Sequence, residues 1–161
     1  MIVACAMRKR STEERCMRRI LLASDFSKAS RPALATAVRM AKRDRATLTI
    51  LHVAEPRMPV SADQSTAYAG WDQHETQLRA WAQRQLAKLT AAATKAGVHA
   101  QSRLAEGSAA REIVRAARRD HADLLVIGTH GRTGPAKLFL GSVTAGVVAT
   151  SACPVMTVRG R

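Results

Sequence analysis

The 161-residue sequence is the size of a single domain, and its 47% hydrophobic and 3% aromatic content predicts a core of Ala, Val, Leu and Ile. Its longest apolar runs are too short to cross a bilayer, and the opening MIVACAM lacks the basic segment and cleavage site of a secretion signal, so we expect a cytoplasmic protein. Three cysteines without a CxxC pair and five scattered histidines argue against a disulfide framework and against a metal site.

The strong positive charge raises the question of a nucleic-acid partner. The formal net charge is +14, from 26 Lys and Arg against 12 Asp and Glu. The basic residues are dispersed along the chain, and no aromatic residues are interleaved with them to stack on bases. We therefore expect a solvated basic surface and no dedicated nucleic-acid site, although weak binding to polyanions stays open.

The first half of the chain begins with a basic N-terminal extension, residues 1–17, which precedes a domain over residues 18–161. The stretch RRILLASDFS (18–27) predicts a buried strand that ends in small and acidic residues. A helix follows over residues 30–44, with Ser30 as its N-cap and Pro32 in its first turn. TLTILHVAE (47–55) predicts the second strand, and residues 55–70 read as a loop rich in Pro, Ser, Ala and Gly.

The second half continues the alternation of helix and strand. Residues 71–97 predict a long helix, whose apolar positions are Leu78, Trp81, Leu86, Leu89 and Ala93. VHAQSRLAEG (98–107) alternates as an edge strand does, and Ser108 is the expected cap of the next helix. ADLLVIG (122–128) is apolar throughout, which predicts a central strand. A helix from Ser142 and a fifth strand, PVMTVRG (154–160), complete the chain.

This regular alternation predicts an α/β fold, a single doubly wound five-stranded parallel sheet with helices on both faces. Ligands of such sheets bind beyond the carboxyl ends of the strands. Three segments follow strands there: Ala23–Asp25, His52–Ala54 and Gly128–Ser142. They converge on one crevice if the first and fourth strands are neighbours.

The segment GTHGRTGPAKLFLGS (128–142) has the spacing G-x2-G-x9-G-S. Glycines between a strand and a helix let backbone N–H groups approach a phosphate. Here the chain resembles the universal stress protein family, in its ATP-binding branch. The resemblance covers residues 18–159 and includes ILLASDFS, LHV, AEG and CPVMTVR.

The resemblance implies the strand order 3-2-1-4-5, a homodimer paired through the C-terminal strand, and ATP, ADP or AMP as ligand, with or without Mg²⁺. Asp25 would bind the ribose or base, Val53 and Ile127 would line the base pocket, and the start of the last helix would bind phosphate. The implied binding residues are Ala23, Asp25, Val53, Ile127, Gly128, His130, Gly131, Gly141, Ser142, Val143 and Thr144.

Each position also has a plainer interpretation. Asp25 could cap a turn, His130 could be solvated, and Val53 and Ile127 could be core residues. No nucleophile stands beside a base and no second carboxylate accompanies Asp25 to hold Mg²⁺, so we expect a protein that holds a nucleotide, with slow ATP hydrolysis left open.

Two other classes of protein are alternatives. Nucleotide-activating enzymes of related fold carry HIGH-like or SGGxDS-like signatures after the first strand, where this chain has SDFS. A KH-type RNA-binding module has a GxxG loop between two helices, whereas GTHG here follows a strand. A stress-response or signalling module that binds ATP is therefore the function that we expect.

Overall fold

The computed structural model describes residues 17–55, 64–129 and 140–160, with the side chains of its long second helix described from Gln73 onward. The strands are β1 (Arg19–Ala23), β2 (Thr47–Ala54), β3 (Ala100–Glu106), β4 (Leu124–Gly128) and β5 (Val155–Val158). The helices are η1 (Lys28–Ser30), α1 (Arg31–Asp44), α2 (Gln64–Lys95), α3 (Ala109–Arg119) and α4 (Ser142–Thr150). All strand pairs are parallel, in the order β3-β2-β1-β4-β5, which confirms the predicted sheet.

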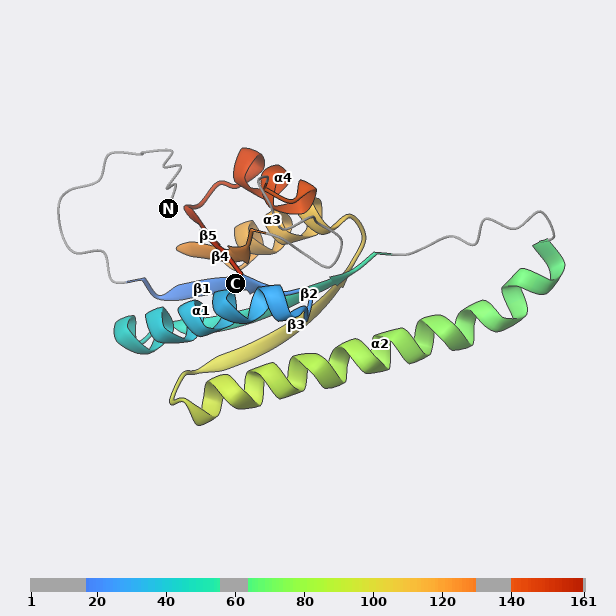
Figure 1. The fold of residues 1–161 in the computed structure, drawn as a ribbon, viewed down its shortest axis with the longest axis horizontal. Helices are drawn as coiled ribbons and strands as arrows, with labels where there is room; N and C mark the ends of the chain where they lie inside the picture. Colours follow the sequence, from blue (N-terminus) through green and yellow to red (C-terminus); the bar gives the residue numbers. More distant parts are fainter. Residues whose placement is uncertain (1–16, 56–63, 130–139, 161) are drawn as a thin grey trace.

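The central strand β1 is buried on both faces because helices cover both sides of the sheet. Its alternate side chains serve two cores: Ile20 and Leu22 join the cluster beneath α1 and α2, and Leu21 and Ala23 join the cluster beneath α3 and α4. Figure 1 shows the two helix pairs on opposite sides of the sheet. A strand buried on both faces has a continuous apolar sequence, which explains the run ILLA after the exposed Arg19.

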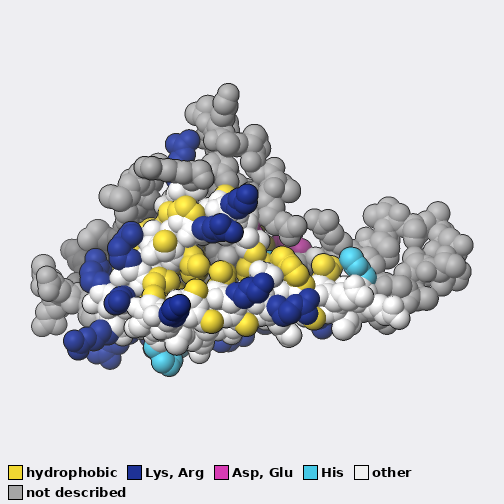
Figure 2. Space-filling view, turned by 60° about the horizontal axis from the view of Figure 1, so that its bottom comes forward, with side chains coloured by type: hydrophobic (Ala, Val, Ile, Leu, Met, Phe, Trp, Pro, Cys, Tyr) yellow, Lys and Arg dark blue, Asp and Glu magenta, His cyan; other side chains and the backbone are white. Residues whose placement is uncertain are grey.

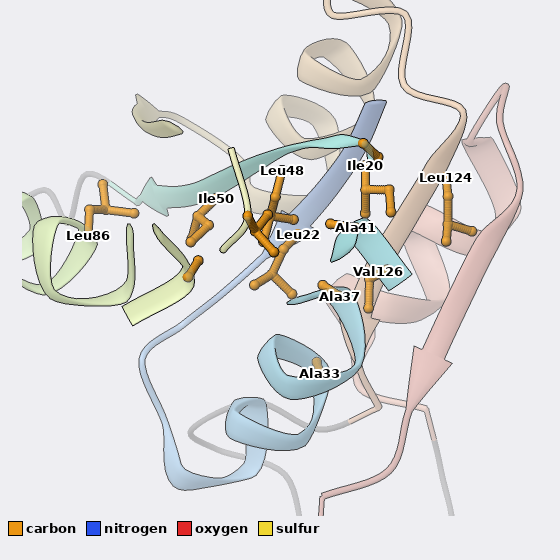
Figure 3. Packing of buried hydrophobic residues seen from close by; sticks show 13 residues of the cluster. Ile20, Leu22, Ala33, Ala37, Ala41, Leu48, Ile50, Leu86, Leu124 and Val126 are labelled. Atoms are coloured by element: carbon orange, nitrogen blue, oxygen red, sulfur yellow. The ribbon is translucent and has the colours of Figure 1, made fainter. Parts of the chain in front are cut away.

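Small residues let α1 lie close to the sheet. Ala33, Ala37 and Ala41 recur every fourth residue, which places them on one helical face, and each is at most 1% exposed. Figure 3 shows this face turned toward Leu22 and Val126. The core therefore needs few aromatic residues, because Ala, Leu, Ile and Val fill the space between α1 and the sheet.

A glycine lets α3 and α4 approach on the other face. A Cβ atom added at Gly146 would lie 3.1 Å from the Cβ of Ala110, a tight contact. Glycine inside a helix costs about 1 kcal/mol relative to alanine, and this close approach gives the cost a packing reason. Val147, on the same turn, is fully buried against the sheet.

The helix α2 differs from the prediction at its start and along its apolar face. It begins at Gln64, seven residues before the expected start, because helix-forming residues in 64–70 were read as a loop. Leu86 and Ala93 are buried as expected, but Leu78 and Trp81 are 51% and 38% exposed. Figure 1 shows the reason: the first half of α2 projects past the sheet, so only its second half finds a surface to cover.

Ser30 and Ser108 lie at the predicted N-cap positions, but neither side chain makes a capping hydrogen bond. Ser30 precedes α1, yet its side chain makes no cap bond; Ser27, one turn earlier, accepts a hydrogen bond from the Ser30 N–H at 3.2 Å and caps the short η1 helix. Ser108 likewise precedes α3 without capping it. None of the described helices has the length and apolarity to span a membrane.

Candidate functional site

Three segments meet at the carboxyl ends of the central strands. Ala23 of β1 pairs with Leu51 of β2 on one side and with Ile127 of β4 on the other. The residues that follow these three positions are therefore neighbours across the sheet edge. This register brings Asp25, Val53 and Gly128 into one region, as the sequence predicted from the fold.

A tight turn follows β1 and holds Asp25. The Asp25 Oδ1 atom accepts a hydrogen bond from the Ser27 N–H at 3.1 Å, and the Ser24 hydroxyl accepts one from the Phe26 N–H at 3.2 Å. Phe26 has φ 63°, a left-handed conformation that is uncommon for a bulky residue. The turn therefore holds a strained backbone in place with its own side chains, a feature often found at binding sites.

Contacts with β2 and α2 support this turn from behind. The His52 Nδ1–H donates to the Ser24 carbonyl at 2.8 Å. The ring of Phe26 lies 4.2 Å from that of His52 and meets Trp81 edge-on at 5.4 Å, measured between ring centroids. Since β2 presents alternate residues to opposite faces, His52 lies on the α2 side while Val53 packs with the cluster beneath α3 and α4.

The second oxygen of Asp25 has no partner in the described residues. Its Oδ2 atom is buried and accepts no hydrogen bond there. A buried acceptor left without a donor costs about 1–3 kcal/mol, so such atoms need a reason to persist. If Asp25 served only to cap the turn, the bond to its Oδ1 atom would be explained but the burial of its Oδ2 atom would not.

The loop between β4 and α4 is closed at its base by backbone bonds. The Gly141 N–H donates to the Thr129 carbonyl at 2.9 Å, and the Thr144 hydroxyl donates to the Gly128 carbonyl at 2.8 Å. These bonds hold the first turn of α4 against the end of β4, next to the Asp25 turn. His130 and Gly131 lie outside the described residues.

The first turn of α4 has the properties of an anion site. Within the described residues, no side chain caps this helix and its first turn holds no acidic residue. Ser142 is exposed, Val143 half-buried and Thr144 buried. Free N–H groups and the helix dipole both favour an anion at such an end.

The start of α3 is different, although it lies at the same edge of the sheet. The Glu55 Oε1 atom accepts a hydrogen bond from the Ala109 N–H at 3.0 Å, and Glu112 stands in the first turn. This helix therefore already has carboxylates of its own at its positive end. Of the two helix starts, α4 is the one suited to an external anion.

The sequence placed His52 at this edge without giving it a role, and it did not point to Glu55. Glu55 lies 54 residues from the helix that it caps, and His52 lies 28 residues from the carbonyl that it binds. A residue that completes a turn from another strand leaves no local pattern. The one available signal was position, because both residues stand at the end of a predicted strand.

A comparison with protein families gives the origin of this arrangement. The model described as "Universal stress protein family" matches residues 17–159, nearly the whole chain. The chain belongs to the universal stress protein family.

Similar universal stress proteins come from distant organisms. The universal stress protein MJ0531 of Methanocaldococcus jannaschii is 32% identical over 148 residues, which cover 91% of this chain and 84% of that protein. Among solved structures, the universal stress protein UspA from Lactobacillus plantarum has a TM-score of 0.77 at 23% identity, covering 89% and 98% of the two chains. It shows that the fold is shared.

Another solved universal stress protein is in complex with cAMP. It is 25% identical to this chain, with a TM-score of 0.66, and the alignment covers 89% of this chain and 97% of that one. In the present universal stress protein, the described residues contain no group of three or more His, Cys, Asp or Glu that could hold a metal ion.

Proposed function

We propose that this universal stress protein binds an adenine nucleotide at the carboxyl edge of its sheet, as a member of the ATP-binding branch with the G-x2-G-x9-G-S motif. The buried Asp25 Oδ2 atom, which lacks a donor among the described residues, carries the proposal. Ribose hydroxyls are donors of the right kind for a carboxylate acceptor. A nucleotide would supply them while its phosphates extend toward α4.

The base, the ribose and the phosphates of a nucleotide would each contact different residues at this edge of the sheet. The base would pack against Val53 and Ile127, near Ala23, and the phosphates would accept hydrogen bonds from the first turn of α4, residues 141–144. Gly128, His130 and Gly131 would border the ribose and phosphates. The cAMP complex of the related universal stress protein supports adenine nucleotides as the ligand class.

ATP, ADP and AMP all fit this description, and Mg²⁺ would accompany the phosphates of ATP without a carboxylate pair to fix it. We propose a cytoplasmic stress-response or signalling module that holds its nucleotide and turns it over slowly or not at all. The test is to analyse the purified protein for bound nucleotide and then to titrate ATP, ADP and AMP into nucleotide-free protein by calorimetry. Turnover at several ATP per second, a typical enzymatic rate, would contradict the binding role.

His52 should influence nucleotide affinity through the Asp25 turn. His52→Phe keeps an aromatic ring beside Phe26 but removes the N–H that donates to the Ser24 carbonyl. One neutral hydrogen bond contributes about 0.5–1.5 kcal/mol, so we expect ATP affinity to fall roughly 2- to 12-fold. His52→Asn offers an amide N–H near the Nδ1 position and should retain most of the affinity.

Calorimetric titration of these two variants, with His99→Phe as a control at an exposed histidine, separates the hydrogen bond from general effects of substitution. If His52→Phe binds ATP as the parent does, or if the asparagine variant loses as much affinity, the bond to Ser24 does not position the site.

We also propose that the protein is a homodimer paired through β5. This edge strand is apolar, with Met156 and Val158 half-buried, whereas β3 at the other edge exposes Gln101 and Ser102. An exposed apolar edge favours pairing with a second strand. Light scattering should give a dimer at micromolar concentration. Met156→Lys should yield monomer, while Ser102→Lys on the other edge should stay dimeric; a monomeric parent would contradict the pairing.

A further inference from the structure

The amino edge of the sheet, opposite the proposed nucleotide site, gathers basic side chains from distant parts of the chain. The helices α1, α2 and α3 all end there, and β1 begins there. Besides Arg19 and Arg43, which bond to the His121 carbonyl and to Asp44, six exposed cations mark this end: Arg18, Lys42, Arg45, Lys95, Arg118 and Arg119. Figure 2 shows Lys and Arg side chains at the left-hand end of the molecule and across the middle of this face, with a small acidic patch right of centre. The fold therefore concentrates charges that look dispersed in the sequence.

The backbone register places two of these residues, Arg18 and Arg45, at neighbouring strand starts with His99 beside them. The Thr47 N–H donates to the Arg18 carbonyl at 2.8 Å, and the Leu48 N–H donates to the His99 carbonyl at 2.9 Å. Arg18, the residues just before Thr47, and His99 therefore stand at three adjacent strand starts. Neighbouring strands are about 4.8 Å apart, so the three starts from β3 to β1 span roughly 10 Å.

The acidic residues of this edge are engaged within the protein, and one of them pairs with a cation of the patch: Asp120 lies 3.5 Å from Arg119. Asp44 accepts from the Arg43 Nε–H at 2.6 Å, and this hydrogen bond lowers the pKa of the Asp44 carboxyl. Asp120 accepts from the Arg103 guanidinium at 2.6 Å. Asp123 Oδ2 accepts from the backbone N–H groups that begin β1, at 2.9 and 3.0 Å. All three carboxylates are half-buried, which leaves the exposed charge of this edge positive.

The helix dipole accounts for only part of this pattern. Cations in the last turn of a helix are stabilised by its dipole, which explains Lys42, Lys95, Arg118 and Arg119. It does not explain Arg18, which precedes a strand. The dipole also favours a cation at Arg45, the C-cap of α1, but it does not explain the φ of 52° there, where glycine is favoured. A bulky cation at a position suited to glycine is a reason to look for a ligand.

We propose that the amino edge is a docking surface for the phosphodiester backbone of nucleic acid, without base recognition and independent of the nucleotide site. Arginine guanidinium groups donate in pairs to phosphate oxygens, and a row of roughly 10 Å along the duplex axis faces about three phosphates of one strand, at about 3.4 Å of axis per phosphate. A hollow of about 220 Å³, lined in part by Arg19, Thr47 and Gln101, adjoins the row.

A nucleic acid fits this surface better than an anionic membrane does. Peripheral membrane binding combines basic residues with apolar side chains that enter the bilayer. In the described part of the chain, the large exposed hydrophobic residues are Leu78, Trp81 and Leu140. Leu78 lies in the half of α2 that projects from the sheet, Trp81 packs against Phe26 at the carboxyl edge, and Leu140 lies two residues before the start of α4. The basic row therefore lacks the apolar anchors that a bilayer would require.

The test compares two triple variants that remove the same charge from different places. Arg18→Gln/Arg45→Gln/Arg118→Gln neutralises the amino edge, and Arg84→Gln/Lys88→Gln/Arg111→Gln neutralises exposed cations elsewhere. Each lowers the formal net charge of +14 by three. Binding to a short mixed-sequence DNA duplex is measured by fluorescence anisotropy between roughly 50 and 200 mM salt, the range in which counterion release is strong.

The edge variant should reduce the slope of log K against log salt by about 2–3, since each phosphate contact contributes about 0.9. The control variant should change it by less than about 1. A saturating concentration of ATP should leave duplex affinity unchanged, because the two sites lie at opposite ends of the strands. A second edge variant, Lys42→Gln/Lys95→Gln/Arg119→Gln, should reduce the salt slope in the same way. It keeps the proposal testable if the first variant does not fold.

Equal slopes for the edge and control variants would overturn the proposal, since net charge alone would then explain binding. So would a parent that fails to bind DNA at the lowest salt, displacement of DNA by ATP, or edge-dependent binding to phosphatidylcholine–phosphatidylglycerol vesicles without DNA binding. None of these results bears on whether ATP binds at the other edge, which the calorimetric titration decides separately.

Discussion

Replacing Leu22 with alanine should lower the free energy of unfolding by about 2–5 kcal/mol, the range for a large side chain removed from a closed core. Leu22 is fully buried at the centre of β1, between α1 and the neighbouring strands. The alanines of α1 have no additional atoms with which to fill the space. For a chain of this size the melting temperature should fall by roughly 5–15 °C.

Leu78→Ala is the matched control, because the same change is made at a side chain that is 51% exposed. Its effect should stay within about 0.5 kcal/mol. Denaturant unfolding followed by circular dichroism measures both variants. A comparable loss in the two would mean that Leu22 does not occupy a closed core and that the packing of α1 on the sheet is different.

Gly141→Val should abolish nucleotide binding and leave the fold intact. Gly141 has φ −57° and ψ 151°, which any residue adopts, so the backbone of the N-cap position does not itself require glycine. A branched side chain there would stand beside the N–H groups of the first turn of α4. The phosphates would lose the space they need, and with it the contacts that a helix start provides.

Ala152→Val adds the same branched side chain at an exposed position beyond the other end of α4. It should bind ATP as the parent does, with an unchanged melting temperature. Calorimetry and circular dichroism applied to both variants distinguish a blocked site from a damaged helix. Parent-like ATP affinity in Gly141→Val would mean that the glycine loop is only a turn.

Much of the fold could be predicted because its determinants are local and periodic. The run ILLA that follows Arg19 in β1 and the fully buried LLVIG of β4 are apolar along their whole length, as is typical of strands buried on both faces. The start of α2 could not be predicted in this way. Its first half projects from the sheet, so no buried face imposes the period of 3.6 residues by which such helices are recognised.

The candidate site also has parts that could be predicted from the sequence and parts that could not. Asp25 and Gly128 could be placed together from sequence, because parallel strands end at one edge. Three features depend on how distant segments meet: the Asp25 Oδ2 atom without a donor among the described residues, the Glu55 cap on α3 and the His52 bond to Ser24. Those contacts, rather than the motif, distinguish the start of α4 from that of α3 as an anion site.

The most direct measurement is a calorimetric titration of ATP into the nucleotide-free parent, Asp25→Ala and Asp123→Ala. Both aspartates accept backbone N–H bonds, but Asp123 lies at the opposite edge of the sheet. A hydrogen bond to a charged group contributes about 1.5–3 kcal/mol, so Asp25→Ala should bind roughly 10- to 150-fold more weakly, with Asp123→Ala like the parent. Equal affinity for Asp25→Ala and the parent, or a parent that gives no binding heat with ATP, ADP or AMP, would contradict a nucleotide site built on Asp25.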